Sequence, residues 1–248
     1  TIETLAGIAA VAVQNTRLFQ QSDWVAEIVH EIRTPLTAIL SYADLLQRED
    51  LDDTMRDQFV RTIQQETARV SRLATQFLDL AQLESGRTNM TREPVDLTDL
   101  MIRAANVIRP TAEQRHQTLE VDLSSRLPTL TGDPERLYQV LLNLMSNAVK
   151  YSDPGDEIQI RANVRDEQVI LAVSDTGPGI PEEQLPQLFQ KFRRLPGSDK
   201  KASGSGLGLV VAREIVAAHR GTIWVDSELQ KGSTFFIALP VDDAPSSS

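Results

Sequence analysis

The first 86 residues show a helical periodicity of apolar positions. Glycine and proline are nearly absent from this part of the chain, and Gly7 and Pro35 are the exceptions. Apolar side chains recur every three or four residues in two successive runs, which predicts two long amphipathic helices. The first run comprises Val25, Ile28, Val29, Ile32, Leu36, Ile39, Leu40, Ala43 and Leu46, and the second comprises Phe59, Ile63, Val70, Leu73, Phe77 and Leu80.

The acidic segment "EDLDDT" (residues 49–54) separates these two runs. Its carboxylates and the hydroxyl of Thr54, as N-cap, mark the start of a helix. Two helices joined by such a short loop form an antiparallel hairpin, which by itself leaves apolar surface of both helices exposed. Because a second copy would complete a four-helix bundle, the pattern predicts a homodimer.

The periodicity changes after about residue 87. The segment "SGRTNMTREPVDL" breaks the helical pattern and reads as a linker. Farther along, helices are predicted over 97–113, 134–150 and 206–219, strands over 118–123, 157–164 and 168–175, and a final hairpin over 221–227 and 233–240. Helices combined with a mostly antiparallel sheet predict an α+β layer domain after the helical hairpin.

Composition narrows the classes of function. The 248 residues carry a net charge of −10 without a basic patch, which argues against a nucleic-acid partner. The absence of cysteine excludes disulfides, thiol nucleophiles and zinc–thiolate sites, and suits a cytoplasmic location. The longest apolar run, near residues 5–13, is too short to span a membrane. The chain starts with Thr1 rather than methionine, so we expect a fragment of a longer protein.

His30 differs from the other histidines by its place on the first helix. It falls opposite the apolar stripe, beside Thr34, so it is not a core residue, and Glu31 is close enough to influence its protonation. Pro35 cannot donate a backbone hydrogen bond to the Glu31 carbonyl, so a bend is expected next to an accessible imidazole. The two other histidines are interpreted as surface or structural residues: His116 and His219.

The helix predicted over 134–150 carries a polar stripe beside its apolar one. Asn143, Asn147 and Lys150 are spaced about one turn apart in "LLNLMSNAVKYS". Amide oxygens can hold a hard cation such as Mg²⁺, and lysine adds a positive charge for phosphate oxygens. Taken alone, a solvated helix face is the simpler explanation of this stripe.

Two glycine-rich segments add groups that suit a nucleotide. In "SDTGPGI", Asp175 ends a strand and can accept from an exocyclic amine such as that of adenine, while Gly177 and Gly179 permit unusual backbone angles. In "GSGLGL" (204–209), backbone N–H groups at a helix start can bind an anion. The second segment matches neither the P-loop nor the dinucleotide-binding fingerprint. Taken alone, each is also typical of an ordinary turn.

The segment "LFQKFRRLPGSDKKAS" (188–203) lies between these two. Its two phenylalanines can anchor a mobile loop, and Lys191, Arg193 and Arg194 form a local basic cluster in an acidic protein. Such a cluster is what a polyphosphate requires, so a lid over a nucleotide is predicted here.

The order and spacing of five motifs resemble the transmitter core of a sensor histidine kinase of two-component systems. They are "HEIRTPL", "NLMSNAVKYS", "DTGPGI", "LFQKF" and "GSGLGL", and the resemblance extends from about residue 22 to 240. It implies an α+β protein of two domains. These are a helical hairpin that forms a dimeric four-helix bundle and an α/β sandwich of the Bergerat (GHKL) ATP-binding type.

The resemblance also implies domain boundaries. Residues 22–87 would form the dimerisation and histidine phosphotransfer domain, 88–95 a linker, 96–241 the ATP-binding catalytic domain and 242–248 a disordered tail. The start of the chain, "LAGIAAVAVQNTRLFQQ", is similar to the last helix of a GAF-type sensor domain, although the start of a coiled coil explains it equally well. Residues 1–21 are therefore predicted to be a signalling helix or coiled coil from an upstream sensor domain.

Residue roles carry over from the family motifs. His30 would be the phosphoacceptor, Glu31 would orient the imidazole and take its proton, and Thr34 would orient a water for phosphatase activity. Asn147 would bind Mg²⁺, with Asn143 nearby. The remaining ATP contacts would come from Lys150, Tyr151, Asp175, Gly177, Gly179, Arg194 (with Arg193 as its alternative), Gly204, Gly206, Leu207, Gly208 and Thr234.

The implied reaction is ATP-dependent autophosphorylation of His30, followed by transfer to an aspartate on the receiver domain of a response regulator. Two alternatives remain open from the residues. One is a Bergerat-type ATPase that forms no phosphohistidine, and the other is a nucleotide-binding scaffold.

Overall fold

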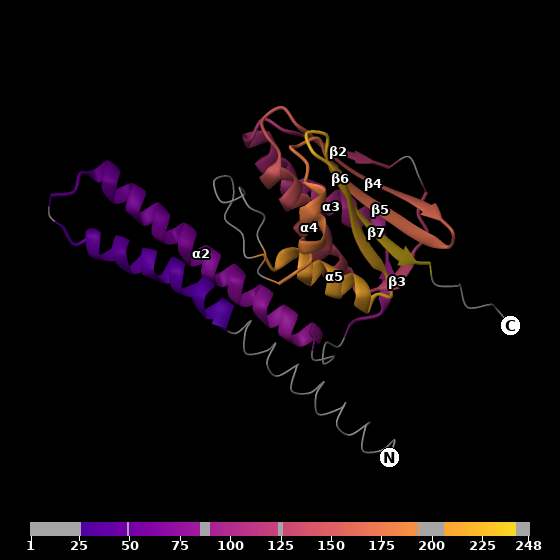
Figure 1. The fold of residues 1–248 in the computed structure, drawn as a ribbon, viewed down its shortest axis with the longest axis horizontal. Coiled ribbons are helices and arrows are strands. Elements are labelled where there is room, and N and C mark those ends of the chain that lie inside the picture. The colour runs from indigo at the N-terminus through magenta and orange to yellow at the C-terminus, as the bar shows by residue number, and fades with distance from the viewer. Residues whose placement is uncertain are drawn as a thin grey trace, which may run out of the picture. The chain divides into compact units, whose positions relative to one another are not determined.

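The computed structural model describes residues 26–48, 50–84, 90–123, 126–191, 193 and 206–241 (Figure 1). The contacts within the chain divide it into two compact units, Thr1–Phe77 and Leu78–Ser248, and the division falls inside a long helix. The predicted signalling helix (1–21) and disordered tail (242–248) lie outside the described residues. No helix within the described ranges combines the length and the hydropathy that crossing a bilayer requires.

The first unit contains the predicted pair of antiparallel helices. A helix covers the described residues 26–45, and α2 (Asp53–Glu84) follows after a short loop. The cap of α2 is Asp52 rather than Thr54, because the Asp52 carboxylate accepts from the backbone N–H of Met55 at 2.7 Å. The rings of Tyr42 and Phe59, 5.3 Å apart, pack the two helices together near the loop.

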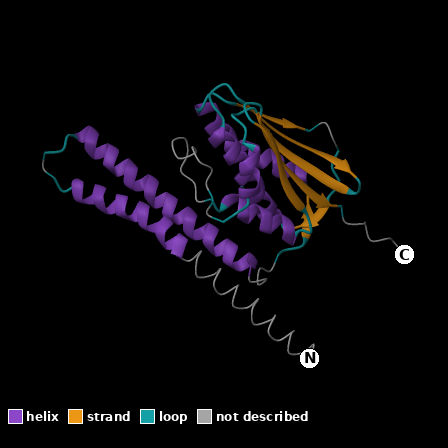
Figure 2. Cartoon of the chain, viewed as in Figure 1, coloured by secondary structure: helices purple, strands orange, loops and turns teal. Residues whose placement is uncertain are grey.

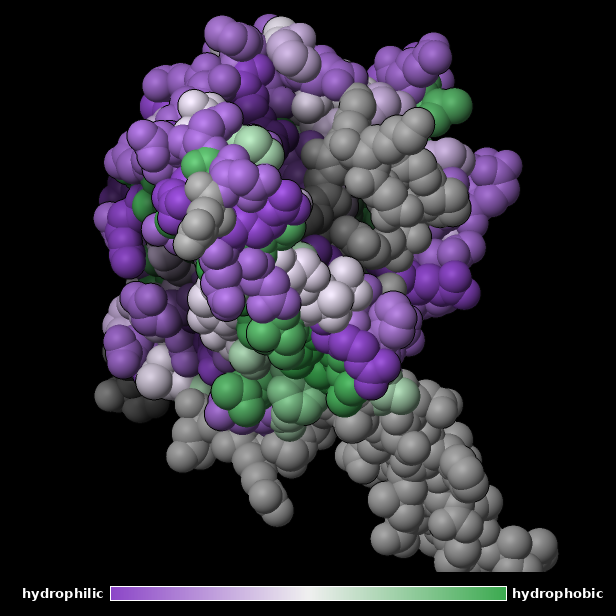
Figure 3. Space-filling view, turned by 90° about the vertical axis from the view of Figure 1, so that its left-hand side faces the viewer, coloured by the Kyte–Doolittle hydropathy of each residue, from purple (hydrophilic) through white to green (hydrophobic). Residues whose placement is uncertain are grey.

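The helix 26–45 continues through Pro35, whose side chain is buried. Its apolar stripe is incompletely covered: Val29, Leu36 and Leu40 keep 49%, 44% and 66% of their surface exposed. The face seen in the space-filling view carries hydrophobic side chains gathered in one patch (Figure 3). The hairpin therefore presents an apolar surface, as the sequence pattern predicted.

The second unit is a sheet covered on one face by helices, which confirms the predicted α+β class (Figure 2). Its five strands are ordered β2-β4-β5-β7-β6, and only the β2–β4 pair is parallel. The strands are β2 (Thr118–Asp122), β4 (Glu157–Arg165), β5 (Gln168–Asp175), β6 (Thr222–Glu228) and β7 (Gly232–Pro240). The covering helices are α3 (Leu97–Gln114), α4 (Pro134–Tyr151) and α5 (Gly208–Ala218).

A second, two-stranded sheet was not predicted. Strand β1 (Glu93–Val95) pairs antiparallel with β3 (Leu130–Gly132), inside the region assigned to the linker. Val95 is almost fully buried, so this part of the predicted linker belongs to the core of the second unit. Three residues that include a proline are too short to show the two-residue period of a strand.

Strand alternation places the end of β5 between the sheet and the helices. Val169, Leu171 and Val173 are buried on the helix-covered face, each contributing roughly 1.5–3 kcal/mol of burial energy. Side chains two residues apart share a face, so Asp175 lies on this same face at the end of the strand. The hydrophobic pattern of β5 therefore decides which way the carboxylate points.

His219 joins the start of α4 to the end of α5. Its Nε2 accepts from the backbone N–H of Asp133 at 2.8 Å, so Nδ1 carries the proton and donates to the Ile215 carbonyl at 2.8 Å. A Cβ at Gly132 would lie 2.7 Å from the ring, so only glycine fits beside it. His219 is thus a structural histidine, one of the two interpretations that the sequence left open.

Candidate functional site

His30 is exposed on the helix 26–45, as its position on the helical wheel predicted. The hydroxyl of Thr34 donates to the His30 carbonyl at 3.3 Å. The carboxylate of Glu31 lies 3.6 Å from the guanidinium of Arg69 on α2, and Glu66 pairs with the same guanidinium at 3.5 Å. The imidazole is therefore accessible, and its neighbouring carboxylate is held by the second helix of the hairpin.

The polar stripe of α4 is half-buried against the start of α5. The side-chain amide of Asn143 donates to the Gly208 carbonyl at 3.2 Å, which orients its oxygen as the remaining acceptor. The ammonium of Lys150 lies 3.2 Å from the Tyr151 hydroxyl and 4.7 Å from the centre of its ring. The stripe thus meets the end of the glycine-rich loop, although the two motifs are about 60 residues apart.

Two residues that the sequence reading passed over fix the C-terminal end of α4. The amide of Gln117 donates to the carbonyls of Val149 (3.1 Å) and Ser152 (2.9 Å). The guanidinium of Arg115 also donates to the Val149 carbonyl, at 3.2 Å. These bonds satisfy carbonyls that lack partners within the helix, and they set the place where Tyr151 leaves it.

Asp175 is a half-buried acceptor at the end of β5. One carboxylate oxygen accepts from the backbone N–H groups of Gly177 (3.1 Å) and Ser233 (3.3 Å). Burial raises the pKa of Asp175 to about 6. The two hydrogen bonds lower the pKa by less than burial raises it, and the negative charge of Asp156 raises it slightly further. At neutral pH the group is a desolvated carboxylate, which suits it to accept from an amine.

The turn after Asp175 is tightly fitted. A Cβ at Gly177 would lie 3.0 Å from the Asp175 carboxylate and 3.2 Å from the Ser152 hydroxyl. Gly179 has φ of 68°, and a Cβ there would collide with the Glu228 carbonyl. The Ser152 hydroxyl is buried and has no hydrogen-bond partner among the described residues. The turn therefore brings an unused hydroxyl close to the carboxylate.

The structure corrects the choice of Thr234 as a partner of Asp175. The Thr234 hydroxyl donates to Ser174 at 3.0 Å, on the opposite face of the sheet, because adjacent strand residues point to opposite faces. The residue beside Asp175 is Ser233, which is 5% exposed and lies 3.0 Å from the Ser227 hydroxyl. The register of β5 against β7 decides whether Ser233 or Thr234 lies beside Asp175, and the sequence alone does not show this register.

The glycine-rich loop is described from Gly206 onward. Gly206 has φ of 67°, Leu207 is fully buried, and α5 begins at Gly208. Two predicted contacts, Arg194 and Gly204, lie outside the described residues.

Arg213 connects α5 to the phenylalanine motif. Its guanidinium donates to the Phe189 carbonyl at 3.1 Å, just after the short helix η1 (Glu182–Gln187). The start of the predicted lid is therefore tied to the helix that follows the glycine-rich loop. A single arginine on a helix gives no sequence signal for such a contact.

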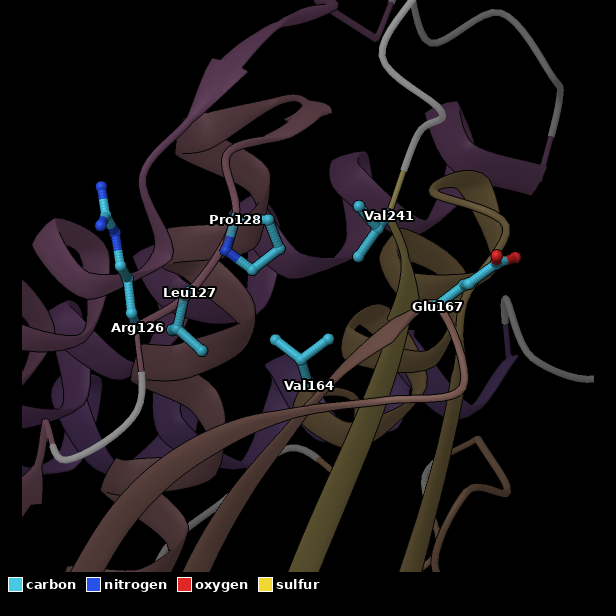
Figure 4. A pocket seen from close by; sticks show the side chains of 6 residues that line it. All are labelled: Arg126, Leu127, Pro128, Val164, Glu167 and Val241. Atoms are coloured by element: carbon cyan, nitrogen blue, oxygen red, sulfur yellow. The ribbon is translucent and has the colours of Figure 1, made fainter.

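One pocket of about 500 Å³ lies at the other end of the sheet (Figure 4). Its lining comes from the segment 126–128, the β4–β5 turn and the end of β7, including Arg126, Glu167 and Val241. Glu167 precedes β5 and Asp175 ends it, so the whole length of the strand, about 23 Å, separates this pocket from the carboxylate. We therefore do not assign the nucleotide to it.

Few side chains near the nucleotide motifs could serve as ligands of a bound cation. Within the described parts of the chain, no cluster of three histidine, cysteine, aspartate or glutamate side chains could hold a metal ion. A divalent cation would rely on the amide oxygens of Asn143 and Asn147 together with phosphate oxygens. This donor set of oxygens fits Mg²⁺, which usually takes few protein ligands.

Two family models match the chain. Residues 20–86 match the His Kinase A (phospho-acceptor) domain, and residues 132–243 match the histidine kinase-, DNA gyrase B- and HSP90-like ATPases. The first match contains His30, and the second contains the stripe on α4 and the carboxylate of Asp175. The second unit is therefore an ATPase-type nucleotide-binding domain.

Similar proteins agree with these matches. The circadian input-output histidine kinase CikA of Synechococcus elongatus is 33% identical over 239 residues, or 94% of this chain, and the chain spans only 32% of that protein. A full-length ShkA structure in complex with AMPPNP is 30% identical, with a TM-score of 0.68, covering 90% of this chain and 47% of that one.

A further structure, histidine kinase ThkA in complex with the response regulator protein TrrA, has a TM-score of 0.71 at 24% identity, and so supports the fold. It covers 91% of this chain and 63% of that one. Together, the two matched domains and these relatives show that the chain belongs to the sensor histidine kinases of two-component systems.

Proposed function

We propose that this chain phosphorylates itself on His30 with ATP bound in the second unit. The observation that carries the proposal is the exposed imidazole of His30 within a phospho-acceptor domain, in a chain that also contains an ATPase-type domain. A nitrogen of the neutral imidazole attacks the γ-phosphorus, the bond to the bridging oxygen breaks, and ADP leaves. Because the two groups lie in different units, transfer requires the units to approach each other.

The residues around His30 would handle the proton of this reaction. Glu31 accepts the imidazole proton as the nitrogen–phosphorus bond forms, and Arg69 holds Glu31 in place. Phosphoryl transfer needs positioning and charge neutralisation more than covalent help, so a fixed carboxylate and an accessible imidazole suffice on this side.

The residues around Asp175 would bind the nucleotide. The Asp175 carboxylate accepts from the exocyclic amine of adenine, and the Asn143 and Asn147 oxygens hold Mg²⁺. Bound Mg²⁺ would offset the charge of the phosphates. Lys150 and Arg194 supply positive charge from the protein, and Gly206 to Gly208 let backbone N–H groups approach the phosphates.

The partners follow from the surface of the hairpin and from the family. We propose a homodimer that covers the exposed Val29, Leu36 and Leu40. The phosphoryl group then passes from His30 to an aspartate of a response regulator, a partner that the ThkA complex supports by analogy of fold. An upstream sensor domain and a cytoplasmic location remain part of this proposal.

Labelling with γ-labelled ATP tests the proposal. Wild type should acquire acid-labile, base-stable label, and His30→Gln should acquire none. His116→Asn is the matched control, because His116 is an exposed histidine at φ of 58°, a conformation that asparagine tolerates. Release of free phosphate without protein label would instead favour an ATPase that forms no phosphohistidine.

We also propose phosphatase activity toward the response regulator, with Thr34 orienting the attacking water. The Thr34 hydroxyl is exposed and now donates to the His30 carbonyl, so it must rotate to act. Thr34→Ala should slow dephosphorylation of the regulator and leave autophosphorylation intact. Thr37→Ala is the control, since its hydroxyl makes the same kind of bond, to the Arg33 carbonyl at 2.9 Å. Equal dephosphorylation by both variants would rule out this role.

A further inference from the structure

The β6–β7 hairpin holds the glycine turn that follows Asp175. The backbone N–H of Gln230 donates to the Pro178 carbonyl at 2.7 Å, and Gly179 packs so closely on Glu228 that a Cβ would not fit. The shape of this turn therefore depends on the hairpin, which is distant from it in sequence.

The hydroxyl of Ser227, on β6, is the centre of this contact. It accepts from the backbone N–H of Ile180 at 2.8 Å, donates to the Gly232 carbonyl at 2.9 Å and lies 3.0 Å from the Ser233 hydroxyl. A hydroxyl has one hydrogen and two lone pairs. Because the Ser227 hydrogen is already used, the third bond must be donated by Ser233.

This arrangement fixes the direction of the Ser233 hydroxyl. Its hydrogen points to Ser227, so its oxygen can offer only lone pairs to a ligand. Ser233 lies on the same face as Asp175 and donates its backbone N–H to that carboxylate. Both side chains are then acceptors. An exocyclic amine offers two N–H donors to such a pair, whereas a keto oxygen at the same place offers none and faces two acceptors.

We propose that Ser227 is a positioning residue that sets the preference of this site for a base with an exocyclic amine. It acts through Ser233, by fixing that hydroxyl as an acceptor beside Asp175. Ser227 itself does not touch the nucleotide. The inference rests on the proposed use of ATP and adds the residue that makes the site discriminate among bases.

Calorimetric titration of the full chain with Mg²⁺ and either ATP or inosine triphosphate tests the inference. The two nucleotides differ in the amine or keto group on the base. Wild type should prefer ATP. Ser227→Ala frees the Ser233 hydrogen, so Ser233 no longer has to accept from the amine and affinity for ATP should fall about tenfold. Affinity for inosine triphosphate should change little, so the preference ratio should fall by about the same factor.

Two variants control for a merely structural effect. Ser227→Thr keeps the hydroxyl and suits a strand, so it should retain the wild-type ratio. Ser174→Ala removes one hydroxyl–hydroxyl bond of the same sheet, on the opposite face, and should also retain it. Should Ser227→Ala fail to fold, Ser227→Cys decides, because it keeps the shape of the side chain while weakening all three bonds, and a partial loss of preference is expected.

A double-variant comparison isolates the path through Ser233. In a Ser233→Ala background, Ser227→Ala should no longer change the preference ratio, because there is no hydroxyl left to orient. If Ser227→Ala still lowered the preference ratio about tenfold in that background, the proposed action through Ser233 would be wrong.

The outcomes separate this inference from the proposed function. If wild type binds neither nucleotide, the use of ATP is wrong and the inference fails with it. If wild type prefers ATP and Ser227→Ala keeps the same ratio, the inference is wrong and the proposed function stands. Equal weakening for both nucleotides also overturns it, because Ser227 would then support the fold alone.

Discussion

The helical hairpin and the α/β unit bury their apolar residues to very different extents. Of residues 26–45, all of them described, only Pro35 is buried, whereas α4 alone buries seven apolar side chains. Leu40 of the hairpin is 66% exposed, and Leu144 of α4 is fully buried. The second unit therefore has a complete core of its own, while the hairpin leaves apolar residues exposed that the proposed second copy would cover. Substitutions in the second unit should consequently change the free energy of unfolding, whereas substitutions on the exposed surface of the hairpin should mainly change its association.

The largest effect on stability is expected from the core of the second unit. Leu144→Ala removes a fully buried side chain and leaves a cavity, so the free energy of unfolding should fall by about 3 kcal/mol. Urea unfolding followed by circular dichroism measures this change. Leu36→Ala, at a site 44% exposed in the hairpin, should cost under about 1 kcal/mol at concentrations where the chain is monomeric. Equal costs would contradict the contrast between the regions.

The next effect concerns the half-buried charge of Asp175. Its pKa of about 6 in the folded state exceeds the unfolded value, so the folded state binds the proton more tightly. Stability from this group is full below about pH 4 and is lost as pH rises through about 6. Asp175→Asn should therefore raise the free energy of unfolding at pH 7.5 by about 2 kcal/mol and weaken ATP binding.

The same group predicts a pH dependence of nucleotide binding. Affinity of wild type for ATP should fall as pH drops through about 6, because the carboxylate becomes protonated, while Asp175→Asn should lack this step. Thermal unfolding and calorimetric titration at pH 5 and 7.5 measure both effects. An Asn variant that loses stability at pH 7.5 would show that the ionised carboxylate is stabilising instead.

A smaller effect is expected on association of the hairpin. Leu40→Asp places a charge on the exposed apolar surface and should weaken the dimer about tenfold, as measured by sedimentation equilibrium. The control is Ser41→Asp, which adds the same charge one residue later, on the face of His30. Loss of the dimer in both variants would assign the effect to net charge rather than to the apolar surface.

The smallest effect separates binding from stability at one hydroxyl. Ser152→Ala removes a buried group that has no partner among the described residues, so stability should change by less than about 0.5 kcal/mol. Affinity for ATP should fall roughly threefold if the hydroxyl serves the ligand. The Ser152 hydroxyl lies next to the Gly177 turn. An unchanged affinity for ATP would show that this hydroxyl contributes neither to stability nor to nucleotide binding.

Periodicity predicted most of the fold, because apolar spacing reports directly on which face of an element is buried. The helices that became α3 and α4 were placed to within one residue, while β1 is too short to carry a period. Motif order predicted the family, and the position of His30 on its helix predicted its exposure. The contacts of Gln117, Arg213 and Ser227 depend on strand register and on helix packing, which no local pattern records. The exchange of Thr234 for Ser233 has the same cause.

The parallel pairing of β2 with β4 bears on how the chain folds. The β4–β5 hairpin closes through two residues of positive φ, Asp166 and Glu167, and such local turns form within microseconds. Thr118 must instead find Glu157, 39 positions later in the chain and beyond α4, a closure with a larger entropic cost. Because Gln117 directly precedes β2, its grip on the end of α4 awaits this slower step. The end of α4, where Lys150 and Tyr151 stand, is therefore expected to become fixed only when β2 joins the sheet.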